Sequence, residues 1–209
     1  MPEIIKVNDS KAYDMIKKSR IPTAPYVFVK KEMDIKSAMK KVGIPCVMKV
    51  SGNTIIHKTE LNGIAMNIET EERALETFNR MMKIKGADSV VIQKQLEGIE
   101  LIIGAKASSE FGNIISVGLG GIYVEVLKDV KFRIAPLTTF DAEAMVKELK
   151  GYEILAGIRG NKPINFSKLY EILVTVGRFA IKNKFKEMDI NPLICNEEGC
   201  WAVDVRIIK

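Results

Sequence analysis

Hydrophobic residues in the first half of the chain alternate between helical and extended spacing. Recurrence every three or four positions predicts amphipathic helices, and short apolar runs bounded by turn residues predict strands. The helical ranges are 10–19, 35–42 and 70–84, the last with Ala74, Leu75, Phe78, Met81 and Met82 facing inward. The extended ranges are 25–29, 45–50, 63–68 and 89–95. Alternating helices and strands favour an α/β layer.

Beyond Gly98 the extended runs follow one another closely, and the short turns between them favour antiparallel pairing. The runs are 100–107, 113–121, 123–129 and 131–136. Helices are predicted at 139–149 and 165–182, and closing strands at 187–195 and 200–208. We therefore expect two α+β lobes that meet near residues 95–99, with a cleft between them.

The composition is that of a globular chain, since 47% of its 209 residues are hydrophobic and 28% are charged. No apolar run approaches the ~20 residues that cross a bilayer, and the N-terminus lacks a signal peptide, so we expect a cytoplasmic protein with no membrane partner. A net charge of +6 raises the question of nucleic acid. Because the lysines alternate with acidic residues and no nucleic-acid motif is present, we expect a solvated surface and a site for anions.

Three cysteines, Cys46, Cys195 and Cys200, are too few and odd in number for a disulfide framework. A zinc site needs more ligands, and the only histidine, His57, lies far from the last two cysteines in sequence. We therefore expect buried free thiols.

Charged residues inside apolar strands are the first candidates for chemistry. Lys49 lies in CVMKVS, so it is either at a sheet edge or pointing at a ligand, and Glu100 and Glu125 raise the same question. The glycine-rich GLGG (118–121) allows backbone amides to approach an anion, although a tight turn explains it as well. It matches neither the P-loop nor the Rossmann pattern.

The last hairpin places oxygen-bearing side chains on paired strands. Asp189 and Asn191 lie in MDINP, and Asp204 lies in AVDV. Mg²⁺ takes one or two such ligands from protein and completes its shell with phosphates and water. The alternative is that Asn-Pro is only a turn and Asp204 an exposed strand residue.

Five long segments, in a fixed order, then carry a resemblance. They are CVMKVSGNTIIHKTELNGIAMNI (46–68), LEGIELIIGAK (96–106), FGNIISVGLGGIYVEVLKDVKFRIAPL (111–137), GYEILAGIRG (151–160) and MDINPLICNEEGCWAVDVRI (188–207). They resemble the ATP-grasp β subunit, or β domain, of NDP-forming acyl-CoA synthetases, specifically the archaeal ADP-forming acetyl-CoA synthetase type. The resemblance implies an ATP-grasp fold, with an N-terminal lobe at 1–96 and a C-terminal lobe with a magnesium-binding hairpin at 97–209.

The resemblance also implies a reaction. In this family acyl-CoA and phosphate give acyl phosphate, whose phosphoryl group passes to histidine and then to ADP, reversibly and with Mg²⁺. ATP or ADP is the nucleotide substrate. The CoA-binding and phosphohistidine domains belong to an α subunit, and nothing in this chain resembles them. We therefore expect half of an acid–thiol ligase, active only with an α subunit in an α2β2 hetero-oligomer.

Matched position by position, Lys49 corresponds to the lysine that contacts nucleotide phosphate, and Glu100 to the acid that binds ribose. Asn191 and Asp204 correspond to the magnesium ligands. The interlobe hinge, whose backbone reads adenine, corresponds to Gln93, Lys94, Gln95 and Leu96. The loop near the transferred phosphoryl group corresponds to Gly118, Gly120, Gly121 and Glu125. Arg159 also belongs to a family motif, and its role stays open.

His57 is the one imidazole of the chain, in IIHKTELNGI. By itself it is most simply a surface or packing residue, but in this family the stretch resembles a mobile loop with a second histidine that ferries the phosphoryl group. Imidazole suits that role because it is nucleophilic near neutral pH. Polar residues 51–54 and the Asn62-Gly63 pair are the expected pivots. Lys58 either steadies the phosphate or is a solvated lysine.

Two other functions stay open. One is a non-catalytic nucleotide-binding module that regulates a partner, which the intact candidate residues argue against. The other is an ATP-grasp enzyme that joins a carboxylate and an amine through acyl phosphate, which needs no separate α chain.

Overall fold

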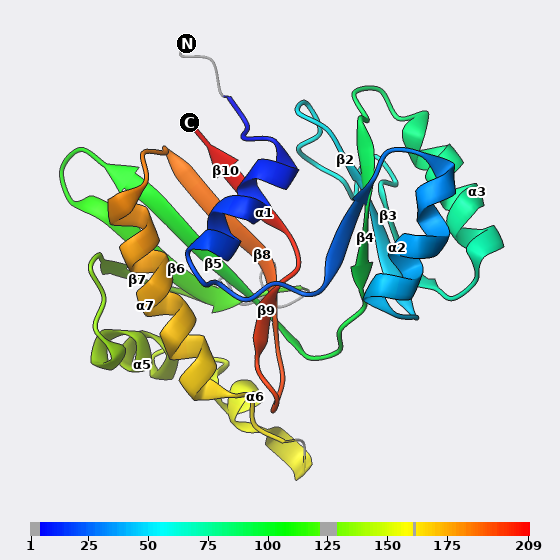
Figure 1. Cartoon of the computed structure of the whole chain (residues 1–209). Helices are drawn as coiled ribbons and strands as arrows, with labels where there is room; N and C mark the ends of the chain where they lie inside the picture. The colour runs from blue at the N-terminus through cyan, green and yellow to red at the C-terminus, as the bar shows by residue number, and fades with distance from the viewer. Residues whose placement is uncertain (1–4, 122–128, 161) are drawn as a thin grey trace. The chain divides into compact units, whose positions relative to one another are not determined.

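The computed structural model describes residues 5–121, 129–160 and 162–209 (Figure 1). Contacts divide the chain into two compact units. The smaller unit contains Asn8–Lys11 and Thr23–Leu96, and the larger unit contains the residues up to Val7, Ala12–Pro22 and Glu97–Lys209. The predicted ranges 1–96 and 97–209 differ from this division at the N-terminus, because helix α1 (Asp9–Lys18) carries residues of both units. The identity of the units as the two predicted lobes stays a prediction.

In the smaller unit four strands form one antiparallel sheet, in the order β1-β4-β2-β3. The strands are β1 (Tyr26–Val29), β2 (Cys46–Ser51), β3 (Ile64–Ile68) and β4 (Ser89–Lys94). Helices α2 (Ile35–Val42) and α3 (Glu71–Met82) each link two strands that are not neighbours. The alternation of helix and strand in the sequence therefore gives antiparallel neighbours here, because each crossover leaves room for a strand of opposite direction.

The core of the smaller unit lies between its sheet and these two helices. Helix α2 ends where Gly43 takes a positive φ of 86°, and α3 begins where the Thr70 side chain accepts a hydrogen bond from the Arg73 amide. Ala74, Phe78 and Met81 are buried as expected. The prediction for Leu75 was wrong: it is 37% exposed, because it follows Ala74 by one step around the helix and leaves the apolar stripe.

The described part of the larger unit contains a six-stranded antiparallel sheet in the order β10-β8-β5-β6-β7, with β9 beside β8. The strands are β5 (Ile99–Ser108), β6 (Gly112–Leu119), β7 (Val130–Ile134), β8 (Glu187–Cys195), β9 (Cys200–Ala202) and β10 (Val205–Ile208). The antiparallel pairing predicted after Gly98 is confirmed. Most of the strand predicted at 123–129 lies outside the described residues.

Helix α7 (Phe166–Lys182) packs on β5 and β6, and α5 (Thr139–Lys147) packs against α7 and β7 (Figure 1). Asn165 caps α7 by accepting a hydrogen bond from the Lys168 amide, and Thr138 forms a capping box with Asp141 at the start of α5. The sequence pattern missed α6 (Tyr152–Ala156), because five residues are too few to show helical periodicity. The α+β class is confirmed.

The cysteine prediction was wrong for two of the three residues. Cys195 and Cys200 form a disulfide, with their Cα atoms 4.1 Å apart, and only Cys46 is a buried free thiol. The pair lie directly opposite each other in the β8–β9 ladder, because the turn 196–199 folds one strand back on the other. Counting cysteines along the chain does not reveal this register.

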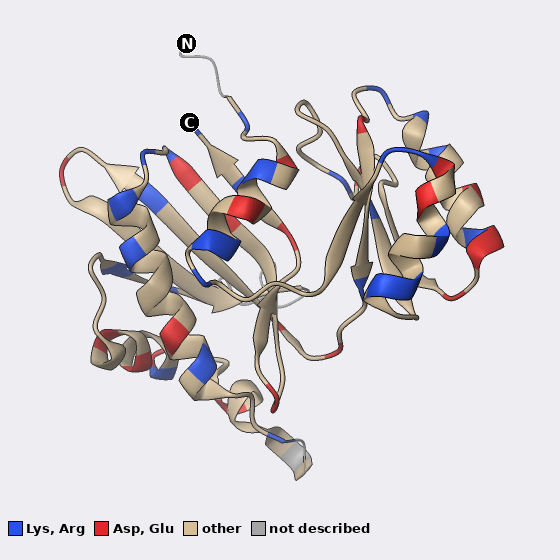
Figure 2. Cartoon of the chain, in the orientation of Figure 1, with Lys and Arg blue, Asp and Glu red and all other residues tan. Residues whose placement is uncertain are grey.

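Charged residues of both signs are interspersed on the outer faces of the helices (Figure 2). Along α3, for example, Glu71, Glu72, Arg73, Glu76 and Arg80 share the solvent side with few apolar neighbours. Among the described residues, no helix is both long and apolar enough to cross a membrane.

Candidate functional site

Lys49 lies in the centre of the smaller unit, on β2, which has β4 on one side and β3 on the other. The sheet-edge alternative is therefore excluded for this residue. Its side chain is 7% exposed, and its Nζ donates a 2.8 Å hydrogen bond to Oε1 of Gln93 on β4. The other face of β2, with Met48 and Val50, belongs to the apolar core. A buried ammonium held by an amide, on the polar face of a sheet, is suited to binding an anionic group.

Gln93 is itself almost completely buried, and its Nε2 has no hydrogen-bond partner among the described residues. A buried amide donor without a partner is uncommon in native proteins and calls for an explanation such as a ligand. Its neighbour Lys94 is exposed, and Leu96 is half-buried. The Gln93 side chain thus belongs beside Lys49 in the candidate site, whereas the sequence comparison assigned only its backbone.

Gln95, the third predicted hinge residue, is tied to β3 by two hydrogen bonds. Its Oε1 accepts from the Asn67 amide at 2.8 Å, and its Nε2 donates to Asn67 Oδ1 at 2.7 Å. Asn67 has a positive φ of 55°, which Asn adopts more readily than most residues. These bonds hold the end of β4 against the edge strand. Sequence reasoning missed Asn67, since nothing in GIAMNI marks it as a partner of a residue so far along the chain.

His57 lies in the turn that joins β2 to β3, with its side chain 66% exposed. Its Nδ1 is 3.8 Å from Glu60 Oε1, too far for a hydrogen bond. Ile55, two residues before it, is buried in the apolar core. Lys58, immediately after it, is 8% exposed, so the expectation of a solvated lysine was wrong. The imidazole is therefore exposed to solvent, while Ile55 before it and Lys58 after it are buried.

In the larger unit, Glu100 and the glycines of GLGG are brought together. Gly118 is the next-to-last residue of β6, and the Gly120 amide donates a 2.7 Å hydrogen bond to the Glu100 carbonyl. A Cβ added to Gly120 would lie 3.0 Å from Glu100 backbone atoms, and one added to Gly121 would lie 3.0 Å from Oε2 of Glu100. Glycine therefore favours this close approach, because a Cβ at either position would make a tight contact. Because the Gly120 amide is already used, it does not supply the anion contact that the glycine pattern suggested.

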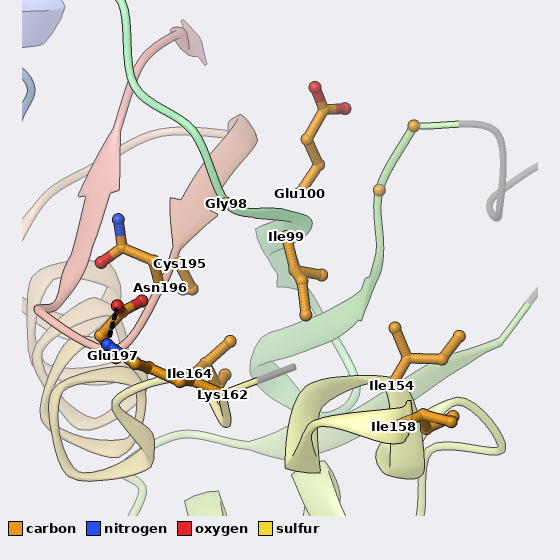
Figure 3. Close-up of a pocket in the computed structure, with 12 residues that line it drawn as sticks. Gly98, Ile99, Glu100, Ile154, Ile158, Lys162, Ile164, Cys195, Asn196 and Glu197 are labelled. Carbon is orange, nitrogen blue, oxygen red and sulfur yellow. Dashed lines mark hydrogen bonds and ion pairs between the residues drawn. The ribbon is translucent and has the colours of Figure 1, made fainter. Parts of the chain in front are cut away.

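These residues border a cavity of about 730 Å³ in the larger unit (Figure 3). One wall comes from α6 and the residues after it, and the opposite wall from the turn 196–199 and the end of β8. Four isoleucines line it: Ile99, Ile154, Ile158 and Ile164. The Glu100 side chain points away from them, since alternate residues of a strand face opposite sides.

The rim of this cavity is charged. Lys162 Nζ donates a 2.9 Å hydrogen bond to Glu197 Oε1, which raises the pKa of the lysine and lowers that of the carboxyl. Asn196, which also lines the cavity, donates through Nδ2 to the Glu97 carbonyl at 3.0 Å. The cavity is thus apolar inside and polar at its edge, which is usual for small-molecule sites.

The two predicted magnesium ligands are adjacent. The Asn191 amide donates to the Asp204 carbonyl at 3.1 Å, although Asp204 lies in the break between β9 and β10 and not on a strand as predicted. Asp204 Oδ1 accepts from the Val205 amide at 3.0 Å. Asp189 instead accepts from Arg206 Nε at 3.0 Å, which removes it from the metal candidates.

Among the described residues, no group of three His, Cys, Asp or Glu side chains is arranged to hold a metal. The Asn191–Asp204 pair nevertheless fits Mg²⁺, which needs only one or two protein oxygens when phosphates and water complete its shell. Glu125 lies outside the described residues, as does the side chain of Arg159. The structure thus forms three local groups: Lys49 with Gln93, Glu100 with Gly120 and Gly121, and Asn191 with Asp204.

Comparison with known proteins gives consistent matches over the whole chain. Residues 5–208 match the family described as the ATP-grasp domain. The chain is 41% identical over 202 residues to acetate–CoA ligase (ADP-forming) II of Archaeoglobus fulgidus, covering 96% of this chain but 30% of that protein. It is 39% identical over 209 residues to acetate–CoA ligase (ADP-forming) I subunit beta of Pyrococcus furiosus, covering 96% of this chain and 90% of that subunit. It therefore spans less than a third of one relative and nearly all of the other.

Solved structures agree. The fold matches dinucleotide forming acetyl-coenzyme A synthetase 1 of Ca. Korarchaeum cryptofilum, in complex with coenzyme A and Ca-AMPCP, with a TM-score of 0.92, 31% identity and coverage of 98% of this chain and 93% of that one. A second structure of that enzyme, with coenzyme A and Mg-AMPPCP, matches with a TM-score of 0.85 and 32% identity over 97% of this chain and 92% of that one. In it, a phosphohistidine segment points towards the nucleotide binding site.

Proposed function

Because this chain belongs to the ATP-grasp domain family and has the ATP-grasp fold of ADP-forming acetyl-CoA synthetases, we propose that it is the nucleotide-binding β part of such an enzyme. The observation that carries the proposal is the buried ammonium of Lys49 on a central strand. It donates to the side-chain oxygen of Gln93, whose Nε2 has no partner among the described residues. A purely structural role does not require a charge there, since an apolar residue fills such a position at lower cost. Nucleotide phosphate is an anion that this group can bind.

In the proposed reaction, acyl-CoA and phosphate give acyl phosphate and CoA, and the phosphoryl group then passes through histidine to ADP. His57 acts as a carrier: an N–P bond forms on its imidazole as the incoming P–N bond breaks, and a β-phosphate oxygen of ADP later takes the group and frees the imidazole. Its exposure supports this role, since both donor and acceptor must reach it.

Lys49 binds the nucleotide phosphates, and Gln93 orients Lys49. Glu100 binds the ribose hydroxyls, and Glu125 is assigned to the loop near the transferred phosphoryl group.

We assign Mg²⁺ to Asn191 and Asp204. When bound, the metal neutralises negative charge on the nucleotide phosphates. Both residues offer oxygen ligands from neighbouring backbone segments, and a Mg-nucleotide analogue is present in the related enzyme.

We also propose a partner. One relative is a separate subunit beta, and another is a chain more than three times as long as the matched region. An α polypeptide with CoA-binding and phosphohistidine domains therefore completes the reaction, in an α2β2 assembly. A cytoplasmic location stays a prediction.

Reconstitution tests the proposal. The chain is mixed with the α subunit of an ADP-forming acetyl-CoA synthetase, and ATP formation is measured from ADP, phosphate and a panel of acyl-CoAs. We expect ATP only when both are present. Nucleotide binding without turnover would favour a regulatory module, and ATP-dependent ligation of a carboxylate to an amine by the chain alone would favour another type of ATP-grasp ligase.

A further inference from the structure

A buried polar cluster lies directly beside the His57 turn. It consists of Asp9, Ser51 and Lys58, whose exposures are 1%, 1% and 8%, and it is called the Asp9 cluster below. The Ser51 hydroxyl donates to Asp9 Oδ2 at 2.9 Å, and Lys58 Nζ lies 3.8 Å from the same oxygen. All three residues belong to the smaller unit. A charged pair at this depth is rare, because each charge loses its hydration.

The cluster joins two distant parts of the sequence. Asp9 is the first residue of α1, and the preceding Asn8 donates through Nδ2 to Asn53 Oδ1 at 2.9 Å. The start of α1 therefore contacts the segment before His57 at Asn53 and the segment after it at Lys58. The turn is held from both sides by the same short piece of chain.

The backbone of the turn is also closed on itself. The Gly63 amide donates to the Lys58 carbonyl at 2.8 Å, and the Asn62 amide donates to the Thr59 carbonyl at 3.0 Å. Arg80 of α3 donates to the Asn62 carbonyl at 2.6 Å. Ile55 lies in the core and Lys58 in the Asp9 cluster, whereas the two residues between them, Ile56 and His57, are exposed. These contacts hold the turn on both sides of His57, while the mobility expected of the loop stays a prediction.

We propose that Asp9 is a positioning residue for phosphoryl transfer, which acts through Lys58 to hold the His57 imidazole in place. The proposal rests on the carrier role of His57 given above. Asp9 touches neither nucleotide nor phosphate in this account. Lys58 is directed to Asp9, so its charge is used to anchor the turn and not to steady the transferred group. A misplacement of about 1 Å in such a group lowers a rate by about 10²-fold, so the anchor matters for turnover.

The test uses the fact that His57 is the only histidine, so an untagged protein gives a single imidazole signal by NMR. In the reconstituted complex, Lys58→Met should lower kcat for ATP formation by ~10-fold or more while the KM for ADP changes by less than about twofold. Its His57 signal should shift or broaden in the isolated chain. The matched control is Lys36→Met, which breaks an exposed pair with Glu71 at 3.1 Å in the same unit and should change neither readout.

A double variant separates positioning from stability. Lys58→Met removes the Lys58 charge from beside the buried Asp9 carboxylate, whereas Asp9→Asn/Lys58→Met removes both charges and should recover much of the lost thermal stability. We expect the double variant to stay slow, with an altered His57 signal. Recovery of both kcat and the signal would show that the cluster serves only stability, and would overturn the proposal.

Two further outcomes distinguish the proposal from the function on which it rests. Wild-type kcat and an unchanged His57 signal in Lys58→Met, together with an inactive His57→Ala complex, would overturn the positioning role alone. Full activity of the His57→Ala complex would overturn the carrier role, and the positioning role with it.

Discussion

At the scale of single residues, the ammonium group of Lys49 has an unusual position, because it is buried on the middle of a sheet and faces an amide. Hydrogen bonds that involve a charged partner contribute more than neutral ones when that partner is present. The arrangement therefore favours an anionic ligand over an empty site.

Replacing this ammonium should weaken nucleotide binding. For Lys49→Met we expect the Kd for MgADP, measured by calorimetry on the isolated chain, to rise by ~10-fold or more, since a charged hydrogen bond contributes ~1.5–3 kcal/mol. The exposed Lys36→Met variant is the control and should bind as the wild type does. Unchanged affinity in a folded Lys49→Met protein would remove this residue from the site.

Cys46 gives a second prediction at this scale. The thiol is fully buried on β2, and burial raises its pKa from 9.0 to about 11. Only the thiolate is nucleophilic, so the pKa change alone lowers its reaction with iodoacetamide at pH 8 by ~10²-fold in the folded protein. Mass spectrometry of the Cys46 peptide, with and without urea, measures this. Equal labelling in both conditions would contradict the buried position.

At the scale of elements, the segment from β8 to β10 carries two aspartates with different surroundings. Asp204 lies in the break between β9 and β10, beside Asn191, whereas Asp189 on β8 pairs with Arg206 on β10. Because β9 ends at Ala202 and β10 begins at Val205, Asp204 lies on a short segment outside the regular strands. One carboxylate is thus placed for a metal, and the other joins two strands.

Substituting each in turn separates these roles. Asp204→Asn should lower turnover in the reconstituted complex by ~10²-fold or more at ordinary Mg²⁺, because the metal neutralises charge on the transferring group. Asp189→Asn should instead leave the Mg²⁺ dependence unchanged and lower the melting temperature, since it removes the negative charge that pairs with Arg206. If Asp204→Asn turned over normally, the metal would have to be placed elsewhere.

At the scale of the whole molecule, the chain is nearly as long as one relative's subunit beta and spans 30% of another relative. The nucleotide-binding residues proposed above all lie on this chain. The acyl-transferring steps require CoA and a phosphohistidine domain, which are assigned to the partner.

The 209-residue chain alone should therefore bind MgADP but form no ATP from acyl-CoA, ADP and phosphate. Luminescence detection of ATP, with and without added α polypeptide, tests this. The matching negative control is the α polypeptide alone. ATP formation by the purified chain without a partner would contradict the division of labour proposed here.

Long elements were the most predictable part of the fold. Helices such as α7 and strands such as β2 show several turns or alternations of apolar residues, so their limits agree with the expected ranges within a residue or two. Helix α6 was missed because it is a single turn and a half, and Leu75 was misplaced because one position around a helix decides between core and solvent.

The candidate site residues were selected from the sequence, but the contacts that they make were not predictable from it. The sequence motifs selected Lys49, Glu100, Asn191 and Asp204, and the resemblance supplied their expected roles. No local pattern indicated that Gln93 bonds to Lys49, that Asn67 bonds to Gln95, or that the Gly120 amide is used by Glu100. These partners are separated by many residues, and only the pairing of strands brings them together.

The sequence by itself determined the α+β class, the order of the long elements and the family, because periodicity and long ordered motifs are properties of the linear chain. Tertiary structure alone decided which side chains meet. Lys58 shows the difference: in the sequence it is one more lysine in a polar turn, but folding places it against Asp9, which lies 49 positions earlier. Burial and long-range contact depend on how the sheet and helix pack, so the contact of Lys58 with Asp9 beside the His57 turn appears only in three dimensions.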